Sequence, residues 1–139
     1  AVVAFRADNV AHMEAARHIR QAVFCEEQGV SAADEWDGKD PVCEHFLVLD
    51  GELALGCARM RPYGPGTHKI ERVAVLQDHR RRGAGAAIMA EILQRLDKAT
   101  VVLNAQLAVE SFYTKLGFVS ESEVFVEAEI PHVHMVRRP

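Results

Sequence analysis

The chain has 139 residues, of which 49% are hydrophobic and 26% are charged, and its formal net charge is -4. These values are typical of one soluble globular domain spanning residues 1–139, and they argue against a general nucleic-acid-binding protein. The three cysteines, Cys25, Cys43 and Cys57, form neither a CxxC pair nor a cluster with histidines. Neither a disulfide framework nor a metal site is therefore predicted. No apolar run approaches the roughly 18 residues of a membrane span, and no signal-peptide pattern is present, so we expect a cytoplasmic protein.

Periodicity and turn residues predict the elements of the chain. Asp8 and Asn9 can cap a first helix, and Gly117 can end the last one. The dipeptide Asp50-Gly51 is a strong hairpin signal. In chain order, the predicted elements are a strand at 1–6, a helix from about 9 to 29, strands at 45–50, 52–61 and 69–76, a helix at 83–98, a strand at 100–104, a helix at 109–115, and strands at 123–128 and 133–137.

This order predicts the fold class. The alternation of strands and helices over residues 69–119 implies a parallel pair of strands, whereas the hairpin near residue 50 is antiparallel. An α+β fold with a mixed sheet and helices on both faces follows. Residues 30–41 hold the sole tryptophan and four acidic residues, and they are predicted to form a loop or a short broken helix at the surface, beside a ligand site.

Residues 73–89 read as a strand, a basic turn, a glycine pair and a helix. The first turn of a helix has unpaired N–H groups and a positive dipole end, so it attracts anions such as phosphate. Glycine lets a ligand approach the backbone closely, and neighbouring arginines add forked donors. A tight turn with a solvated basic patch is the structural alternative.

Two common phosphate-binding motifs are excluded at this turn. A dinucleotide-binding GxGxxG would need a small residue where Ile88 stands. A Walker loop would need Gly-Lys-Ser/Thr where Ala86 and Ala87 stand.

Two motifs, at this turn and at residues 112–118, resemble sequence signatures of the GNAT superfamily of N-acetyltransferases. Residues 80–85 match its Arg/Gln-x-x-Gly-x-Gly/Ala signature and follow a strand, residues 71–75, that resembles the fourth strand of the family. Residues 112–118 resemble its later Tyr-x-Lys-x-Gly-Phe segment. Residues 23–29 and 129–135 are similar to small bacterial members of the ElaA/YjcF-like type. The resemblance covers nearly the whole chain and implies the GNAT acyl-CoA N-acyltransferase fold.

The resemblance implies that acetyl-CoA is the cosubstrate and that no metal takes part. Backbone groups of one strand would pair with the pantetheine arm, and a free N–H there could stabilise the thioester oxygen. These strand residues are Val73, Ala74 and Val75. The residues implied around the pyrophosphate are Arg80, Arg81, Arg82, Gly83, Ala84, Gly85 and Ala86.

The resemblance also assigns a proton donor. The hydroxyl of Tyr113 would protonate the leaving thiolate; the alternative is a core aromatic residue on a helix. The companion asparagine of the family lies seven residues before this tyrosine, where the chain has Gln106. Whether Gln106 or the nearby Asn104 contacts the cosubstrate stays open.

An alkylammonium acceptor must lose a proton before its nitrogen attacks the thioester. Strand alternation would put Glu71 on the same face as Val73 and Val75, which makes it the favoured base. The alternative for Glu71 is a strand-end ion pair with Arg72 or Lys69. The bases considered are Glu71, Glu27, Asp37, His45 and His132.

The acceptor wall is expected at the end of the first helix and in the acidic loop. For Glu27 and Gln28, which end this helix, the alternative is a solvated helix end. His132 and His134 lie on one side of a strand, but without a third ligand they do not predict a metal site. The residues predicted to bind the acceptor are Glu27, Gln28, Asp37 and His45.

The predicted function is transfer of the acetyl group of acetyl-CoA to a primary amine of a small molecule, by direct attack in a ternary complex. The acidic residues 34–40 suggest a cationic acceptor. The alternative is a non-catalytic acyl-CoA-binding sensor or partner protein. A module that binds nucleic acid through Arg80–Arg82 is a third reading, which the net charge disfavours. Neither a nucleic-acid nor a membrane partner is expected, and the resemblance suggests a homodimer.

Overall fold

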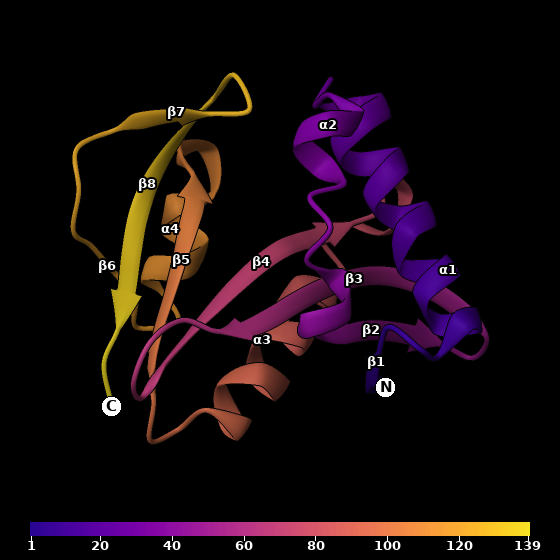
Figure 1. Ribbon diagram of the computed structural model, residues 1–139, viewed down its shortest axis with the longest axis horizontal. Helices are drawn as coiled ribbons and strands as arrows, with labels where there is room; N and C mark the ends of the chain where they lie inside the picture. The colour runs from indigo at the N-terminus through magenta and orange to yellow at the C-terminus, as the bar shows by residue number, and fades with distance from the viewer.

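The computed structural model describes residues 1–139 and contains one mixed sheet of 8 strands (Figure 1). The strand order is β1-β2-β3-β4-β5-β8-β6, and β7 pairs with β8. Only β4 and β5 run parallel, so the predicted mixed sheet is confirmed. The strands are β1 Val2–Arg6, β2 Glu44–Asp50, β3 Leu53–Pro62, β4 Thr67–Val75, β5 Thr100–Gln106, β6 Val119–Ser120, β7 Phe125–Glu127 and β8 Ile130–Arg137.

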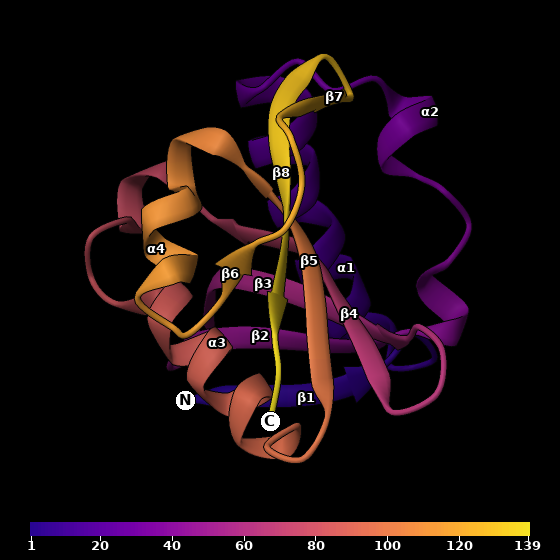
Figure 2. The same cartoon turned by 90° about the vertical axis from the view of Figure 1, so that its left-hand side faces the viewer.

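Helices cover both faces of the sheet, with α3 and α4 on one side and α1 on the other (Figure 2). The first helix continues without a break into a π-helical segment, η1, which ends just before Gly29. Short helical turns lie in the loops between the longer elements. The helical segments are α1 Val10–Arg20, η1 Gln21–Glu27, α2 Ala32–Glu35, η2 Asp40–Val42, η3 Gln77–His79, α3 Ala84–Arg95, η4 Leu107–Val109 and α4 Glu110–Thr114.

The core has two parts, one on each face of the sheet. Alternate residues of β2 show the division, because Phe46 packs toward α3 while its neighbour Leu47 packs toward α1. The α1 side includes Met13 and Ile19 of the helix itself, whose first turn is capped by the Asn9 side chain. The larger part, beneath α3, includes Ile88, Met89, Ile92 and Leu93. Both helices are therefore held by apolar stripes on the sheet.

The parallel pair β4–β5 comes apart part-way along its length. The register joins Thr67–Lys69 to Thr100–Val102 and goes no further, although β4 continues to Val75 and β5 to Gln106. Figure 1 shows the two strands diverging beyond this point. The separation leaves backbone N–H and C=O groups of both strands facing an opening, which must be filled by side chains, water or a ligand.

A bulge in β4 changes which way its side chains point. Cys57 pairs with Ala74 and Arg59 pairs with Glu71, so β4 has one more residue than β3 over this stretch. Arg72 takes up the extra residue with a φ of 58°. Glu71 therefore shares the α1 face with Ala74, whereas Val73 and Val75 pack toward α3. The prediction that Glu71 lies on the same face as these valines was wrong, because it assumed an unbroken alternation.

Several boundaries differ from those expected. The helix predicted at 83–98 ends at Arg95, and the strand predicted from 69 begins at Thr67. The two-residue strand β6 was not predicted, because it is too short to show a period of two. The acidic loop contains α2 and η2, in line with the broken helix considered for residues 30–41.

Candidate active site

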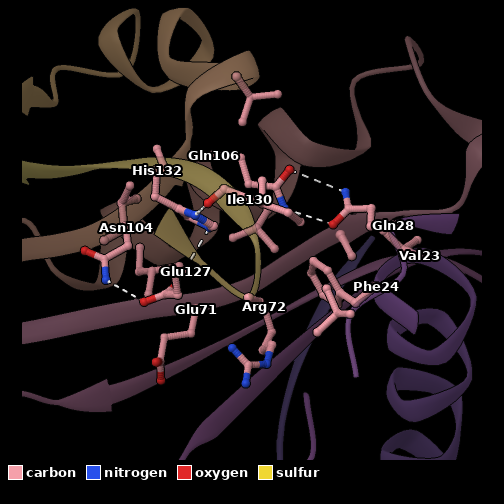
Figure 3. A pocket seen from close by; sticks show the side chains of 18 of the residues that line it. Val23, Phe24, Gln28, Glu71, Arg72, Asn104, Gln106, Glu127, Ile130 and His132 are labelled. Atoms are coloured by element: carbon pink, nitrogen blue, oxygen red, sulfur yellow. Dashed lines mark hydrogen bonds and ion pairs between the residues drawn. The ribbon is translucent and has the colours of Figure 1, made fainter. Parts of the chain in front are cut away.

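A cavity of about 900 Å³ lies where β4 and β5 separate. The two strands form its floor, and η1 and the α2 segment form one wall. The opposite wall consists of α4 and the hairpin of β7 and β8. Figure 3 shows its side chains converging from these elements. Among the predicted site residues, those that line the cavity are Gln28, Asp37, Glu71, Val73, Ala74, Val75, Arg80, Arg81, Gly85, Asn104, Gln106 and Tyr113.

The turn between β4 and α3 is shaped to expose backbone N–H groups. Gly83, the N-cap of α3, has a φ of 80°, and Arg81 has a φ of 66°. No side chain caps this helix, so the N–H groups of its first turn stay available to a ligand. A Cβ on Gly83 would meet nothing within 4 Å, and the backbone conformation is thus the reason for glycine there. An uncapped helix start beside a separated pair of strands fits a ligand that carries a pyrophosphate.

Arg80 is held at this turn by two partners. Its Nε donates to the carbonyl oxygen of Val75 at 3.0 Å, and its two terminal nitrogens donate to Glu27, each at 2.6 Å. The hydrogen bond from Arg80 lowers the pKa of Glu27. Glu27, which was predicted to contact the acceptor, is thus an ion-pair partner of Arg80 and does not line the cavity. Arg82, Gly83, Ala84 and Ala86 are also absent from the lining.

Tyr113 presents its side chain from α4 and is 7% exposed. Its ring makes edge contacts with Phe112 and Phe118, at centroid distances of 5.0 and 5.9 Å. Burial raises the pKa of Tyr113 to about 12. The hydroxyl therefore carries its proton at neutral pH and can donate it to a group in the cavity.

The two amides that were considered for the cosubstrate have different partners. Gln106 of β5 and Gln28, the residue after η1, exchange hydrogen bonds of 2.9 and 3.4 Å, which join the floor of the cavity to the η1 wall (Figure 3). Asn104 instead bonds to the hairpin residue Glu127 at 3.3 Å and to His134 at 2.8 Å. Asn104 thus holds a wall of the cavity, whereas the Gln28–Gln106 pair crosses it.

Glu71 is surrounded by cations. Arg61 donates to it at 2.8 Å, and nitrogens of Arg59 and Lys69 lie 3.3 and 3.7 Å away. Burial raises the pKa of Glu71, but the hydrogen bond from Arg61 and the nearby charges outweigh it, so that the pKa is lower than usual. The predicted partner Lys69 is present, but Arg72 is bound elsewhere. A carboxylate so strongly stabilised in its charged form is a weak base.

Three of the four acidic residues in and after α2 are paired with arginines. Asp37 and Asp40 accept hydrogen bonds from Arg59, and Glu35 accepts one from Arg20. Burial alone would raise the pKa of Asp37, but the bond from Arg59 and other donors lower it. Asp34, by contrast, is exposed, lines the cavity and forms no ion pair. The cationic acceptor suggested by residues 34–40 therefore stays a prediction that rests on this one unpaired carboxylate.

His45 lies outside the cavity lining, contrary to its predicted contact with the acceptor. Its ring stacks on Phe5 at 5.5 Å, and its Nε2 lies 2.9 Å from the carbonyl oxygen of Asp40. Burial lowers the pKa of His45. The residue packs beneath α1 in the core. Which helix covers which face of β2 decides this position, and the sequence alone does not show it.

The hairpin of β7 and β8 contributes residues that the sequence did not single out. Glu127, Ala128 and Ile130 line the cavity beside His132, which was considered as a base. The turn at 128–129 contains neither glycine nor asparagine, so no turn signal revealed its register. Arg72 was likewise missed as a residue of the cavity floor, because nothing in the sequence marks the bulge.

The structure contains no group of three or more His, Cys, Asp or Glu side chains that could hold a metal ion. None of its helices combines the length and apolar character needed to cross a bilayer.

Comparison with known proteins identifies the family. A family model described as an acetyltransferase (GNAT) domain matches residues 25–139. The uncharacterized N-acetyltransferase YjcF of Bacillus subtilis is 38% identical, with 94% of this chain and 96% of that protein covered. Escherichia coli ElaA has a TM-score of 0.89 at 28% identity, with 99% of each chain covered. An aminoglycoside 6'-N-acetyltransferase complexed with coenzyme A shares the fold at 13% identity, with a TM-score of 0.76, covering 99% of this chain and 96% of that one.

These matches confirm the family that the two motifs indicated, together with the fold and the enzyme class. The chain belongs to the GNAT acetyltransferase family.

Proposed function

We propose that this protein transfers the acetyl group of acetyl-CoA to a primary amine of a small molecule by direct attack, with both substrates bound at once. The observation that carries the proposal is that one cavity, between β4 and β5, is lined both by the helix-start turn and by Tyr113. Acetyl-CoA and the acceptor amine can then meet in one cavity, and the acetyl group can pass between them without a covalent enzyme intermediate.

In this proposal, the donor lies along β4. The uncapped start of α3 and the basic turn before it hold the pyrophosphate through backbone N–H groups and arginine. Backbone groups of Val73, Ala74 and Val75 that face the opening pair with the pantetheine arm, and one of their N–H groups stabilises the oxygen of the thioester. The coenzyme A complex of the aminoglycoside acetyltransferase with the same fold supports this choice of cosubstrate.

Tyr113 is the proposed acid. When the amine nitrogen attacks the thioester carbon and the C–S bond breaks, the sulfur becomes a thiolate that needs a proton. A buried tyrosine with a pKa of about 12 is protonated at neutral pH and lines the same cavity. Replacing its hydroxyl removes the proton source without removing the ring that packs against Phe112 and Phe118.

Incubation of the protein with acetyl-CoA and a panel of small primary amines tests the proposal. We expect free CoA to be released with at least one amine and the acetylated amine to be found by mass spectrometry. The variant Tyr113→Phe should lose about 10²–10⁴-fold in kcat, the usual contribution of a positioned acid, while CoA binding by calorimetry is unchanged. Full activity of Tyr113→Phe would contradict the assigned role. Binding of CoA without transfer to any amine would instead favour the non-catalytic sensor.

A further inference from the structure

His132 has a defined proton arrangement at the edge of the cavity. The residue is 6% exposed and stacks on Phe125 at a centroid distance of 6.0 Å. Its Nδ1 lies 2.6 Å from the carbonyl oxygen of Ile130. Because a carbonyl oxygen can only accept, Nδ1 carries the hydrogen, and the neutral ring keeps a lone pair on Nε2.

A fixed carboxylate lies beside this lone pair. An oxygen of Glu127 is 3.8 Å from Nε2 of His132. The other oxygen of Glu127 accepts from Asn104 at 3.3 Å, and Asn104 accepts in turn from His134 at 2.8 Å. The carboxylate is thus held where it would stabilise a positive charge formed when Nε2 takes up a proton.

The charged surroundings of His132 differ from those of Glu71. Glu127 is the ion-pair partner that His132 has in the structure, and the strand partners of His132 on β5 and β7 are the uncharged Gln106 and Phe125. Glu71 and Arg72 of β4 line the cavity floor. In Figure 3 the side chain of Glu71 extends away from His132 and Glu127. Three cations already neutralise Glu71, whereas the charged side chain beside Nε2 of His132 is the carboxylate of Glu127.

We propose that His132 is the general base that accepts the proton of the acceptor ammonium, and that Glu127 is its positioning residue. This inference rests on the proposed function. One N–H bond of the ammonium breaks and the Nε2–H bond of His132 forms. The neutral nitrogen attacks the thioester carbon, the C–S bond breaks, and the hydroxyl of Tyr113 gives its proton to sulfur. The second nitrogen proton restores that hydroxyl through solvent, and His132 releases its proton to water, so that the products are an amide, a thiol and one proton.

The variant His132→Asn tests the role of Nε2 selectively. The asparagine amide can still donate to the carbonyl oxygen of Ile130, but it has no acceptor at the Nε2 position. His18→Asn is the matched control, because His18 is exposed on α1 and does not line the cavity. Glu71→Gln tests the competing base, and Glu127→Gln tests the positioning residue.

Rates should be measured with two amines, the most reactive alkylamine of the panel and methoxyamine, whose nitrogen is unprotonated at neutral pH. For the alkylamine, we expect His132→Asn to lower kcat by about 10²–10⁴-fold and to abolish the loss of rate that the wild type shows as the pH falls. For methoxyamine, the defect should largely disappear, because no proton has to be removed before attack. CoA binding by calorimetry should be unchanged, Glu127→Gln should lower kcat less than His132→Asn, and His18→Asn should match the wild type.

An NMR measurement provides a readout that does not depend on turnover. The imidazole nitrogen shifts of neutral His132 should show hydrogen on Nδ1 and none on Nε2. Hydrogen on Nε2, full alkylamine activity of His132→Asn, or an equal loss with both amines would each overturn this inference alone. A selective loss in Glu71→Gln in place of His132→Asn would do the same. Absence of turnover by the wild type with every amine would overturn the proposed function, and this inference with it.

Discussion

Arg59 joins the α2 wall of the cavity to the sheet. Its side chain is 1% exposed and contacts three carboxylates, those of Asp37 at 2.5 Å, Asp40 at 3.0 Å and Glu71 at 3.3 Å. Two of these belong to the segment around α2 and η2, and the third belongs to β4. This wall is therefore fixed to the sheet largely by buried charge, so that removal of the one cation leaves three carboxylates short of a partner.

We predict that Arg59→Ala lowers the free energy of unfolding by about 3–5 kcal/mol, the usual cost of breaking a buried ion pair. Urea denaturation at neutral pH measures this change. Arg138→Ala is the control, because the pair between Arg138 and Glu121 is exposed and its loss should leave the midpoint unchanged. A wild-type midpoint for Arg59→Ala would show that the buried charges do not hold this wall.

Single residues differ in how far the sequence predicts their surroundings. Gly83 and Tyr113 lie in short motifs, so their positions at a helix start and on a helix follow from neighbours along the chain. The surroundings of His45 and Glu27 depend on contacts with Asp40 and Arg80, and the second of these lies 53 positions away. Such contacts are set by how the layers pack, which local periodicity does not encode.

At the level of elements, the sequence predicts the position of β4 well but the direction of its side chains poorly. Its existence and its place before the glycine turn were predicted from composition. Its bulge was not, because Arg72 is a residue type that rarely adopts a φ of 58° and gives no sign of doing so. Contacts of Arg72 with Glu35 and Asp37 keep this conformation in place. The alternation of faces therefore fails at Arg72, next to Glu71, the residue that had been inferred to be the base.

The turn of the β7–β8 hairpin is a second place where residue type and conformation disagree. Glu127 pairs with Ile130, so the loop has two residues, Ala128 and Glu129, with φ values of 51° and 64°. Turns of this kind favour Asn-Gly, and other residues pay a cost of about 1 kcal/mol or more in this conformation. The hairpin carries Glu127 and His132, so the turn sets the geometry of one cavity wall.

We predict that the double variant Ala128→Asn, Glu129→Gly raises Tm by roughly 4 °C, the shift that about 1 kcal/mol gives in a domain of this size. Thermal unfolding followed by circular dichroism measures the change. Ala128→Val is the matched control and should lower Tm, because a β-branched residue fits this region poorly. A lower Tm for the Asn-Gly variant would contradict the assigned turn.

On the scale of the whole molecule, the cavity lies between two groups of elements. The helix-start turn and α4 lie on the α3 side of the sheet, whereas η1, α2 and the β7–β8 hairpin form the remaining walls. The sequence predicted the first group because its motifs are local. The positions of η1, α2 and the hairpin were predicted poorly. These elements are fixed by the Gln28–Gln106 pair and by buried ion pairs, which join segments far apart in the chain.

Initial rates with both substrates varied test the central claim of direct transfer most directly. Acetyl-CoA is varied at several fixed concentrations of the most reactive amine, and double-reciprocal plots are compared. Direct attack in a ternary complex predicts lines that intersect, with no acetyl group found on the protein by mass spectrometry after incubation with acetyl-CoA alone. Parallel lines, together with an acetylated protein that passes its acetyl group to the amine, would contradict direct transfer.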